Sequence, residues 1–175
     1  MGRRVLCAVA LCAILRGAAA DYEFDRWYVG AAGEIALPQG GGDLRRLGGG
    51  AVKAGYYFTD TVAIDGEVAV LEDKVGGAVR GLWHLQGFEE FGKLFGYERF
   101  DPFVTFGVAS LFASHHVFAD GSHRTAIGPT AGVGAFYHLT DYWSLRFDAM
   151  AAMAVDSPCG MSYGISLGLQ WSFGD

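Results

Sequence analysis

The chain has 175 residues, of which 51% are hydrophobic and 14% aromatic, and its formal net charge is −6 at pH 7. This acidic balance argues against a nucleic acid as partner. Beyond residue 20, no uninterrupted apolar run reaches the roughly 20 residues that a membrane-spanning helix needs. The sequence therefore excludes a helical membrane protein.

The first twenty residues have the layout of a secretory signal. Arg3 and Arg4 precede an apolar run over residues 5–15, and Ala18–Ala20 supplies the small residues of a cleavage site. We expect residues 1–20 to be removed and residues 21–175 to form one domain. Ten basic and nineteen acidic residues then remain, a net charge of about −9, and Cys159 stands alone. No intramolecular disulfide or cysteine-based zinc site is then possible.

Short runs that alternate apolar with small or polar residues recur along the rest of the chain. Such alternation, together with 27 glycines, is typical of strands with one apolar face, whereas few stretches show helical periodicity. The pattern predicts eight strands, at residues 26–37, 47–58, 62–72, 77–88, 101–113, 126–138, 142–154 and 162–173.

The connections between these strands alternate in length. Thr59-Asp60 and Thr140-Asp141 predict tight turns, whereas residues 38–46, 114–125 and 155–161 are looser and richer in turn-forming residues. Short turns on one side and longer loops on the other are typical of outer-membrane barrels. Two segments depart from this rule: 89–98 is long and amphipathic, with one helical turn expected, and 72–74 is short.

Two hairpins match each other without a gap. Residues 54–67 and 135–148 both read as a strand ending in aromatic residues, a Thr-Asp turn and a second strand. Aromatic residues beside turns are typical of the girdle at a membrane interface. Strand parity predicts an interfacial set of outward-facing aromatic residues: Trp27, Tyr56, Phe58, Trp83, Tyr137, Trp143, Trp171 and Phe173.

The last strand shows the alternation most clearly. Its two faces separate large apolar residues from small or polar ones. The first set is Ile165, Leu167, Leu169, Trp171 and Phe173, and the second is Ser166, Gly168, Gln170 and Ser172. The pattern fits a strand between lipid and the inside of a barrel, and it predicts an all-β, eight-stranded antiparallel transmembrane barrel with up-and-down meander topology.

The same parity sends seven charged residues to the barrel interior. They are Glu34, Lys53, Asp65, Glu67, Arg80, Arg146 and Asp148. Asp65 and Arg146 occupy equivalent positions of the two matched hairpins, as do Glu67 and Asp148. We expect a network of ion pairs, because buried charges need partners. Either this network is structural, or an exchange of partners opens a gated ion path; the narrow interior of eight strands favours the first interpretation.

Three segments carry a resemblance to a known family. Residues 26–33, 134–148 and 166–174 resemble the small eight-stranded outer-membrane barrels of the OmpA membrane-domain, porin-like type. This resemblance implies an integral location in the bacterial outer membrane, contact with lipid and lipopolysaccharide, and insertion by the barrel assembly machinery, which reads an aromatic last strand. It implies no cofactor.

One predicted loop holds the residues with most chemical potential. Ser114, His115 and His116 lie at one end of it, and Ser122-His123-Arg124 at the other. Some barrels of this size are lipid A-modifying enzymes with a serine and a histidine at the rim, and imidazoles also suit zinc or copper. No His-x-Ser-Asn-Ala type of segment is present. We expect ordinary polar loop residues, with neither catalysis nor a metal site.

These observations predict a non-enzymatic integral outer-membrane protein with a structural, envelope or surface-loop interaction role. A narrow or gated pore is the first alternative, and a lipid A-modifying barrel enzyme is the second. A soluble lipocalin-like barrel fits less well, because its interior would be apolar and the predicted interior is polar.

Overall fold

The computed structural model describes residues 27–38, 47–72, 74–85, 99–111, 126–153 and 161–173. These segments form eight strands. Their bounds are β1 Trp27–Pro38, β2 Leu47–Thr59, β3 Val62–Leu71, β4 Lys74–His84, β5 Phe100–Leu111, β6 Ala126–His138, β7 Trp143–Met153 and β8 Met161–Phe173. The predicted signal peptide, the predicted helical turn within 89–98 and the histidine-containing loop lie outside the described residues.

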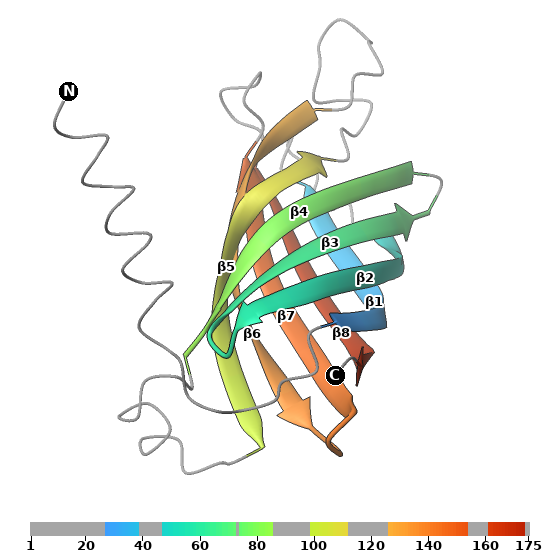
Figure 1. Cartoon of the computed structure of the whole chain (residues 1–175). Coiled ribbons are helices and arrows are strands. Elements are labelled where there is room, and N and C mark those ends of the chain that lie inside the picture. Colours follow the sequence, from blue (N-terminus) through green and yellow to red (C-terminus); the bar gives the residue numbers. More distant parts are fainter. Residues whose placement is uncertain are drawn as a thin grey trace, which may run out of the picture.

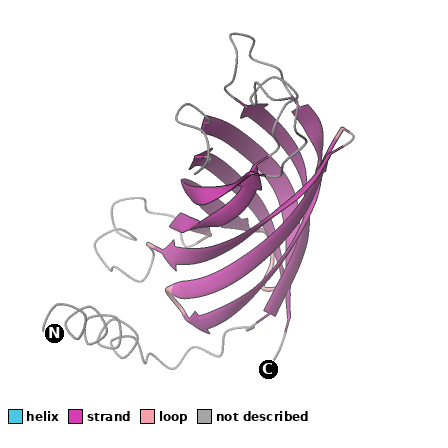
Figure 2. Cartoon of the chain, turned by 90° about the horizontal axis from the view of Figure 1, so that it is seen from above, coloured by secondary structure: helices cyan, strands magenta, loops and turns pink. Residues whose placement is uncertain are grey.

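The strands form one closed antiparallel barrel in which each pairs with its neighbours in the sequence (Figure 1). Closure comes from β1 and β8, whose register runs from Trp27 opposite Phe173 to Pro38 opposite Ser162. Figure 2 shows the strands wrapping around a single interior. Because the barrel closes, no strand is left with an unpaired edge. The predicted eight-stranded meander is confirmed.

The largest boundary difference concerns β4, which was predicted at residues 77–88 and runs from Lys74 to His84. Leu71 pairs with Lys74, so the connection from β3 contains only two residues. Glu72 has a φ of 55°, in the left-handed region that tight hairpin turns require. Strand pairing therefore begins directly after the turn, several residues before the apolar alternation becomes visible in the sequence.

The two ends of the barrel differ. We call one the turn end; it holds the start of β1, the end of β8 and both Thr-Asp turns. There the hydroxyl of Thr59 accepts a hydrogen bond from the Val62 amide (3.1 Å), and the hydroxyl of Thr140 accepts one from the Trp143 amide (3.0 Å). The threonine thus closes both turns in the same way. The opposite end, where β3 connects to β4, is the loop end.

Side chains alternate between the outside and the inside of the barrel along each strand. On β5, Val104, Phe106 and Val108 are exposed, whereas Phe103 and Thr105 are buried. The exposed surface of the strands is accordingly apolar, and most of the charged residues that the structure describes lie in the interior. None of the described residues belongs to a helix long and apolar enough to cross a membrane.

Candidate functional site

The interior is charged at mid-height, where strand alternation points six ionisable side chains inward from four strands. Their relative exposure lies between 1% and 8%, so water screens them poorly. The six residues are Lys53 on β2, Asp65 and Glu67 on β3, Arg80 on β4, and Arg146 and Asp148 on β7.

On the β3 side of the interior, Arg80 joins two carboxylates. Its Nε lies 2.9 Å from Asp65 Oδ1 and its Nη2 lies 2.8 Å from Glu67 Oε2. Its Nη1 contacts the Met150 sulfur. Glu67 Oε2 also lies 3.1 Å from Lys53 Nζ, so this carboxylate links two cations.

Two ion pairs then cross the interior to β7. Lys53 Nζ lies 2.6 Å from Asp148 Oδ2, and Arg146 Nη1 lies 2.6 Å from Asp65 Oδ2. Asp148 also accepts hydrogen bonds from Arg146 (2.9 Å) and from the Ser166 hydroxyl (3.0 Å). These contacts complete the circuit from one wall of the barrel to the other.

The six residues form a closed ring of alternating charge, which we call the ion-pair ring. Each cation contacts two carboxylates and each carboxylate contacts two cations, so the formal charges cancel. The order around the ring is Asp65, Arg80, Glu67, Lys53, Asp148, Arg146 and back to Asp65. Removing one member of such a buried, fully paired set is costly, because it leaves an uncompensated charge in the interior.

Glu34, the seventh predicted interior charge, is buried but does not join the ring. Its position on β1 is opposite Gly49 on one side and Ser166 on the other. Its Oε2 is buried and has no hydrogen-bond partner among the described residues. The structure therefore brings six of the seven predicted residues together and leaves Glu34 beside them.

An aromatic layer lies between the ion-pair ring and the turn end. It comprises buried apolar residues from six strands: Tyr28, Tyr57, Ala63, Leu82, Phe103 and Phe136. The Arg146 guanidinium lies 5.3 Å from the ring centres of both Phe103 and Phe136, within cation–π range. Arg146 thus joins the ion-pair ring to the aromatic layer. Strand parity turns both Phe103 and Phe136 inward, but nothing else in the sequence marks these two residues.

A buried histidine–carboxylate pair, which is not among the predicted site residues, lies near the turn end. His84 Nδ1 lies 2.6 Å from Asp101 Oδ2, and the imidazole stacks on Phe136 at 5.5 Å. His138 Nδ1 lies 2.8 Å from the Ser144 hydroxyl. His84 and Asp101 are both on inward-facing positions, so parity is the signal that could have found them.

Six of the eight predicted interfacial aromatic residues form two groups at the turn end. Trp27 contacts Tyr56, which contacts Phe58, with ring centres 4.8 and 5.2 Å apart. On the neighbouring strands, Trp171 stacks with Trp143 (6.4 Å) and with Phe173 (4.9 Å). Because Trp27 pairs with Phe173 across the β1–β8 closure, the two groups adjoin.

The two remaining aromatic residues of that set also lie near the turn end. Trp83 is opposite Val62 on β3, and Tyr137 is opposite Leu145 on β7.

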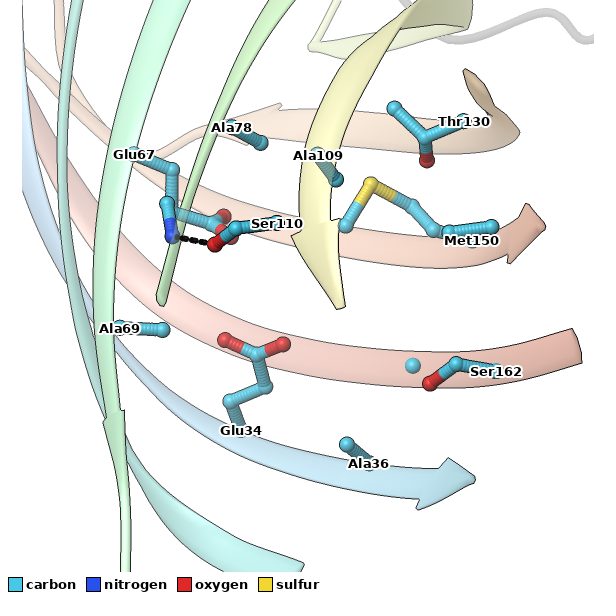
Figure 3. A pocket seen from close by; sticks show the side chains of 13 residues that line it. Glu34, Ala36, Glu67, Ala69, Ala78, Ala109, Ser110, Thr130, Met150 and Ser162 are labelled. Atoms are coloured by element: carbon cyan, nitrogen blue, oxygen red, sulfur yellow. Dashed lines mark hydrogen bonds between the residues drawn. The ribbon is translucent and has the colours of Figure 1, made fainter. Parts of the chain in front are cut away.

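A cavity of about 50 Å³ lies in the interior toward the loop end (Figure 3). Glu34 and Glu67 contribute carboxylates to its wall, and Ser110, Thr130 and Ser162 contribute hydroxyls. Within the described segments, no group of three histidine, cysteine or acidic side chains is arranged to hold a metal ion.

The predicted loop candidates Ser114, His115, His116, Ser122, His123 and Arg124 lie outside the described residues. Their catalytic or metal-binding role therefore stays a hypothesis from the sequence. The side-chain contacts that the structure describes lie in the barrel interior and on its apolar outer face.

The fold is similar to three solved outer-membrane proteins. OprG from Pseudomonas aeruginosa has a TM-score of 0.58 and 9% identity, with 87% of this chain and 100% of that chain covered. Neisserial surface protein A has a TM-score of 0.58 and 16% identity, with 84% of this chain and 97% of that chain covered. Ail, the attachment invasion locus protein of Yersinia pestis, has a TM-score of 0.54 and 13% identity, with 85% of this chain and 99% of that chain covered. At these identities the likeness concerns the fold alone.

Comparison of the sequence with known proteins gives the family. No curated protein matches the chain in sequence. The model of the outer membrane protein beta-barrel domain matches residues 5–173, nearly the whole chain. Together with the closed eight-stranded barrel and its apolar outer face, this match identifies the chain as a member of the outer membrane protein beta-barrel domain family.

Proposed function

We propose that this outer-membrane protein is a non-enzymatic anchor, whose barrel stays closed to solutes and whose loop end serves envelope or surface interactions. The observation that carries the proposal is the double obstruction of the interior. The ion-pair ring spans the barrel from β2–β4 to β7, and the aromatic layer lies beneath it. An eight-stranded interior is just wide enough for side chains to fill, so two such layers support a barrel closed to solutes.

The orientation of the barrel in the membrane follows from the family. Outer-membrane barrels have short periplasmic turns and longer extracellular loops. The turn end, with its Thr59 and Thr140 turns, would then face the periplasm, and the loop end would face the outside. The two aromatic groups around Trp27 and Trp171 would lie at the periplasmic interface of the bilayer.

The proposed partners are those of an integral barrel. Lipid, including lipopolysaccharide, would cover the exposed apolar side chains such as Phe106 and Leu167. The barrel assembly machinery would insert the chain by way of β8, whose outward face carries Trp171 and Phe173. We also propose removal of residues 1–20 on export, with cleavage near Ala20.

A gated pore is the second candidate function, favoured by one observation. The ion-pair ring is built only of side chains, so an exchange of partners would rearrange the interior without separating any strand. A pore predicts discrete ionic conductance in planar bilayers, whereas a closed anchor predicts none.

Two experiments test the proposed function. Cell fractionation with a heat-modifiability gel should find the protein in the outer membrane, migrating differently before and after boiling. A soluble periplasmic protein with identical migration would contradict the proposal. Mass spectra of lipid A from expressing cells should be unchanged, and loss or gain of an acyl chain that depends on His115 or His123 would favour an enzyme instead.

A further inference from the structure

Glu34 is a buried carboxylate that lies outside the ion-pair ring. The three cations and three carboxylates of the ring cancel, and the buried Asp101 carboxylate near the turn end contacts His84, so the ring has no spare cation for Glu34. The residue is 8% exposed, and its Oε2 is buried without a hydrogen-bond partner among the described residues. A buried carboxylate without a partner is costly, so something must neutralise it.

The Glu34 carboxylate points into the cavity at the loop end, as Figure 3 shows. Glu67, two strands away on β3, also lines the cavity, and its Oε2 already contacts Lys53 and Arg80. At about 50 Å³, the cavity has room for a few water-sized species. A neutralising group for Glu34 therefore has space within the barrel.

Besides the Met150 sulfur, which contacts Arg80 Nη1, the other side-chain heteroatoms around the cavity are hydroxyl oxygens. Ser110 Oγ accepts a hydrogen bond from the Gly77 amide (2.7 Å), and Thr130 Oγ1 donates to the Ala151 carbonyl (3.1 Å). Ser162 adds a third hydroxyl. Both bonded hydroxyls keep lone pairs for a further contact. Oxygen donors of this kind, with carboxylates, suit hard cations.

We propose that this cavity binds one small monovalent cation, Na⁺ or K⁺, partly hydrated and held against Glu34. A single positive charge matches the one carboxylate of Glu34, whereas a divalent ion would overcompensate it. The described residues also lack the cluster of three metal-ligating side chains that a dedicated metal centre would need. The bound cation stabilises the folded barrel, because it neutralises a charge that only the folded chain buries.

The proposal is tested with the refolded barrel in detergent, using ²³Na NMR and urea unfolding. The wild-type protein should broaden the ²³Na line, and K⁺ should compete. Its urea midpoint should rise with NaCl or KCl relative to N-methylglucamine chloride of equal ionic strength, because a ligand of the folded state alone stabilises that state. The large organic cation does not fit the cavity.

Two variants and a matched control locate the effect. Glu34→Gln keeps the shape of the side chain but removes its charge, and it should abolish both the ²³Na broadening and the selective salt effect. Ser162→Val should weaken Na⁺ binding severalfold while Glu34 remains. Glu72→Gln removes an exposed carboxylate at the same end and should behave like the wild type.

Three results would overturn the proposal. Equal ²³Na broadening by the wild type and by Glu34→Gln would place the ion elsewhere. A midpoint that responds to pH but not to the choice of cation would mean that a proton neutralises Glu34. If Glu34→Gln fails to fold, Ser162→Val decides, and unchanged Na⁺ binding in that variant would contradict the cavity as the site.

Discussion

Arg146 and Asp65 form an ion pair across the barrel, with Nη1 and Oδ2 2.6 Å apart. Their strands, β7 and β3, are separated by half of the barrel circumference in either direction. The two residues also occupy equivalent positions of the matched hairpins. The two matched hairpins thus lie on opposite walls of the barrel and are joined by this ion pair of the ion-pair ring. Arg146 also contacts the aromatic layer.

Replacement of Arg146 tests the energetic importance of that ring. Arg146→Ala leaves Asp65 and Asp148 without one of their partners, so the free energy of unfolding should fall by about 3–5 kcal/mol. Urea titration in lipid vesicles, followed by tryptophan fluorescence, measures it. Arg99→Ala, at an exposed position, should leave the midpoint unchanged. An equally small effect in both variants would show that the ring contributes little to stability.

A double-mutant cycle on Lys53 and Asp148 tests the pairing itself. Their 2.6 Å contact crosses the interior, so each single neutral variant, Lys53→Met or Asp148→Asn, leaves a buried charge with one ion-pair partner fewer. The double variant should lose less than the sum of the single variants, with a coupling of about 0.5–3 kcal/mol. Additive losses would mean that the two groups do not interact in the folded barrel.

Gly55 makes room for an aromatic ring in the interior. A Cβ at this position would fall on the Tyr28 ring, so Gly55→Ala should cost about 1–3 kcal/mol through overpacking. In a Tyr28→Ala background, which removes the clashing ring, the Gly55→Ala substitution should cost less. Gly33→Ala is the control, because the nearest atom to its Cβ is 4.0 Å away. A Gly55→Ala barrel as stable as Gly33→Ala would contradict the packing of the aromatic layer.

The loss of stability caused by a charge on the outer face should depend on the depth of that position in the membrane. Phe106→Arg, near the middle of β5, should destabilise the barrel by about 2–4 kcal/mol, whereas Phe58→Arg, beside the Thr59 turn, should cost about 0–1 kcal/mol. Both phenylalanines are exposed, so packing differs little between them. Equal losses in vesicle unfolding would argue against the proposed position of the bilayer.

Strand parity made most of the fold predictable. Alternation repeats at every second residue, so it identifies strands and their faces wherever one face is apolar, as from Ile165 to Phe173 on β8. Alternation does not predict the end of a strand where the backbone of a turn determines that end. The start of β4 at Lys74 depends on the left-handed backbone of Glu72, which no apolar pattern reports.

The sequence predicts which charged residues face the barrel interior, but it does not predict which of them form ion pairs with each other. Parity assigns Lys53 and Glu34 to the same interior, yet the stagger between strands decides which charges reach each other. Because of this stagger, Glu34 lines the loop-end cavity and does not join the ion-pair ring. The His84–Asp101 pair spans the connection between β4 and β5, and only the three-dimensional register brings the two together.

The central claim is a closed barrel, and single-channel recording tests it most directly. The refolded wild-type protein in a planar bilayer should give no discrete conductance steps, because the ion-pair ring and the aromatic layer both block the interior. Arg146→Ala, which weakens both layers, serves as the comparison. Reproducible unit steps from the wild-type barrel, altered or lost in Arg146→Ala, would contradict the account and establish a pore.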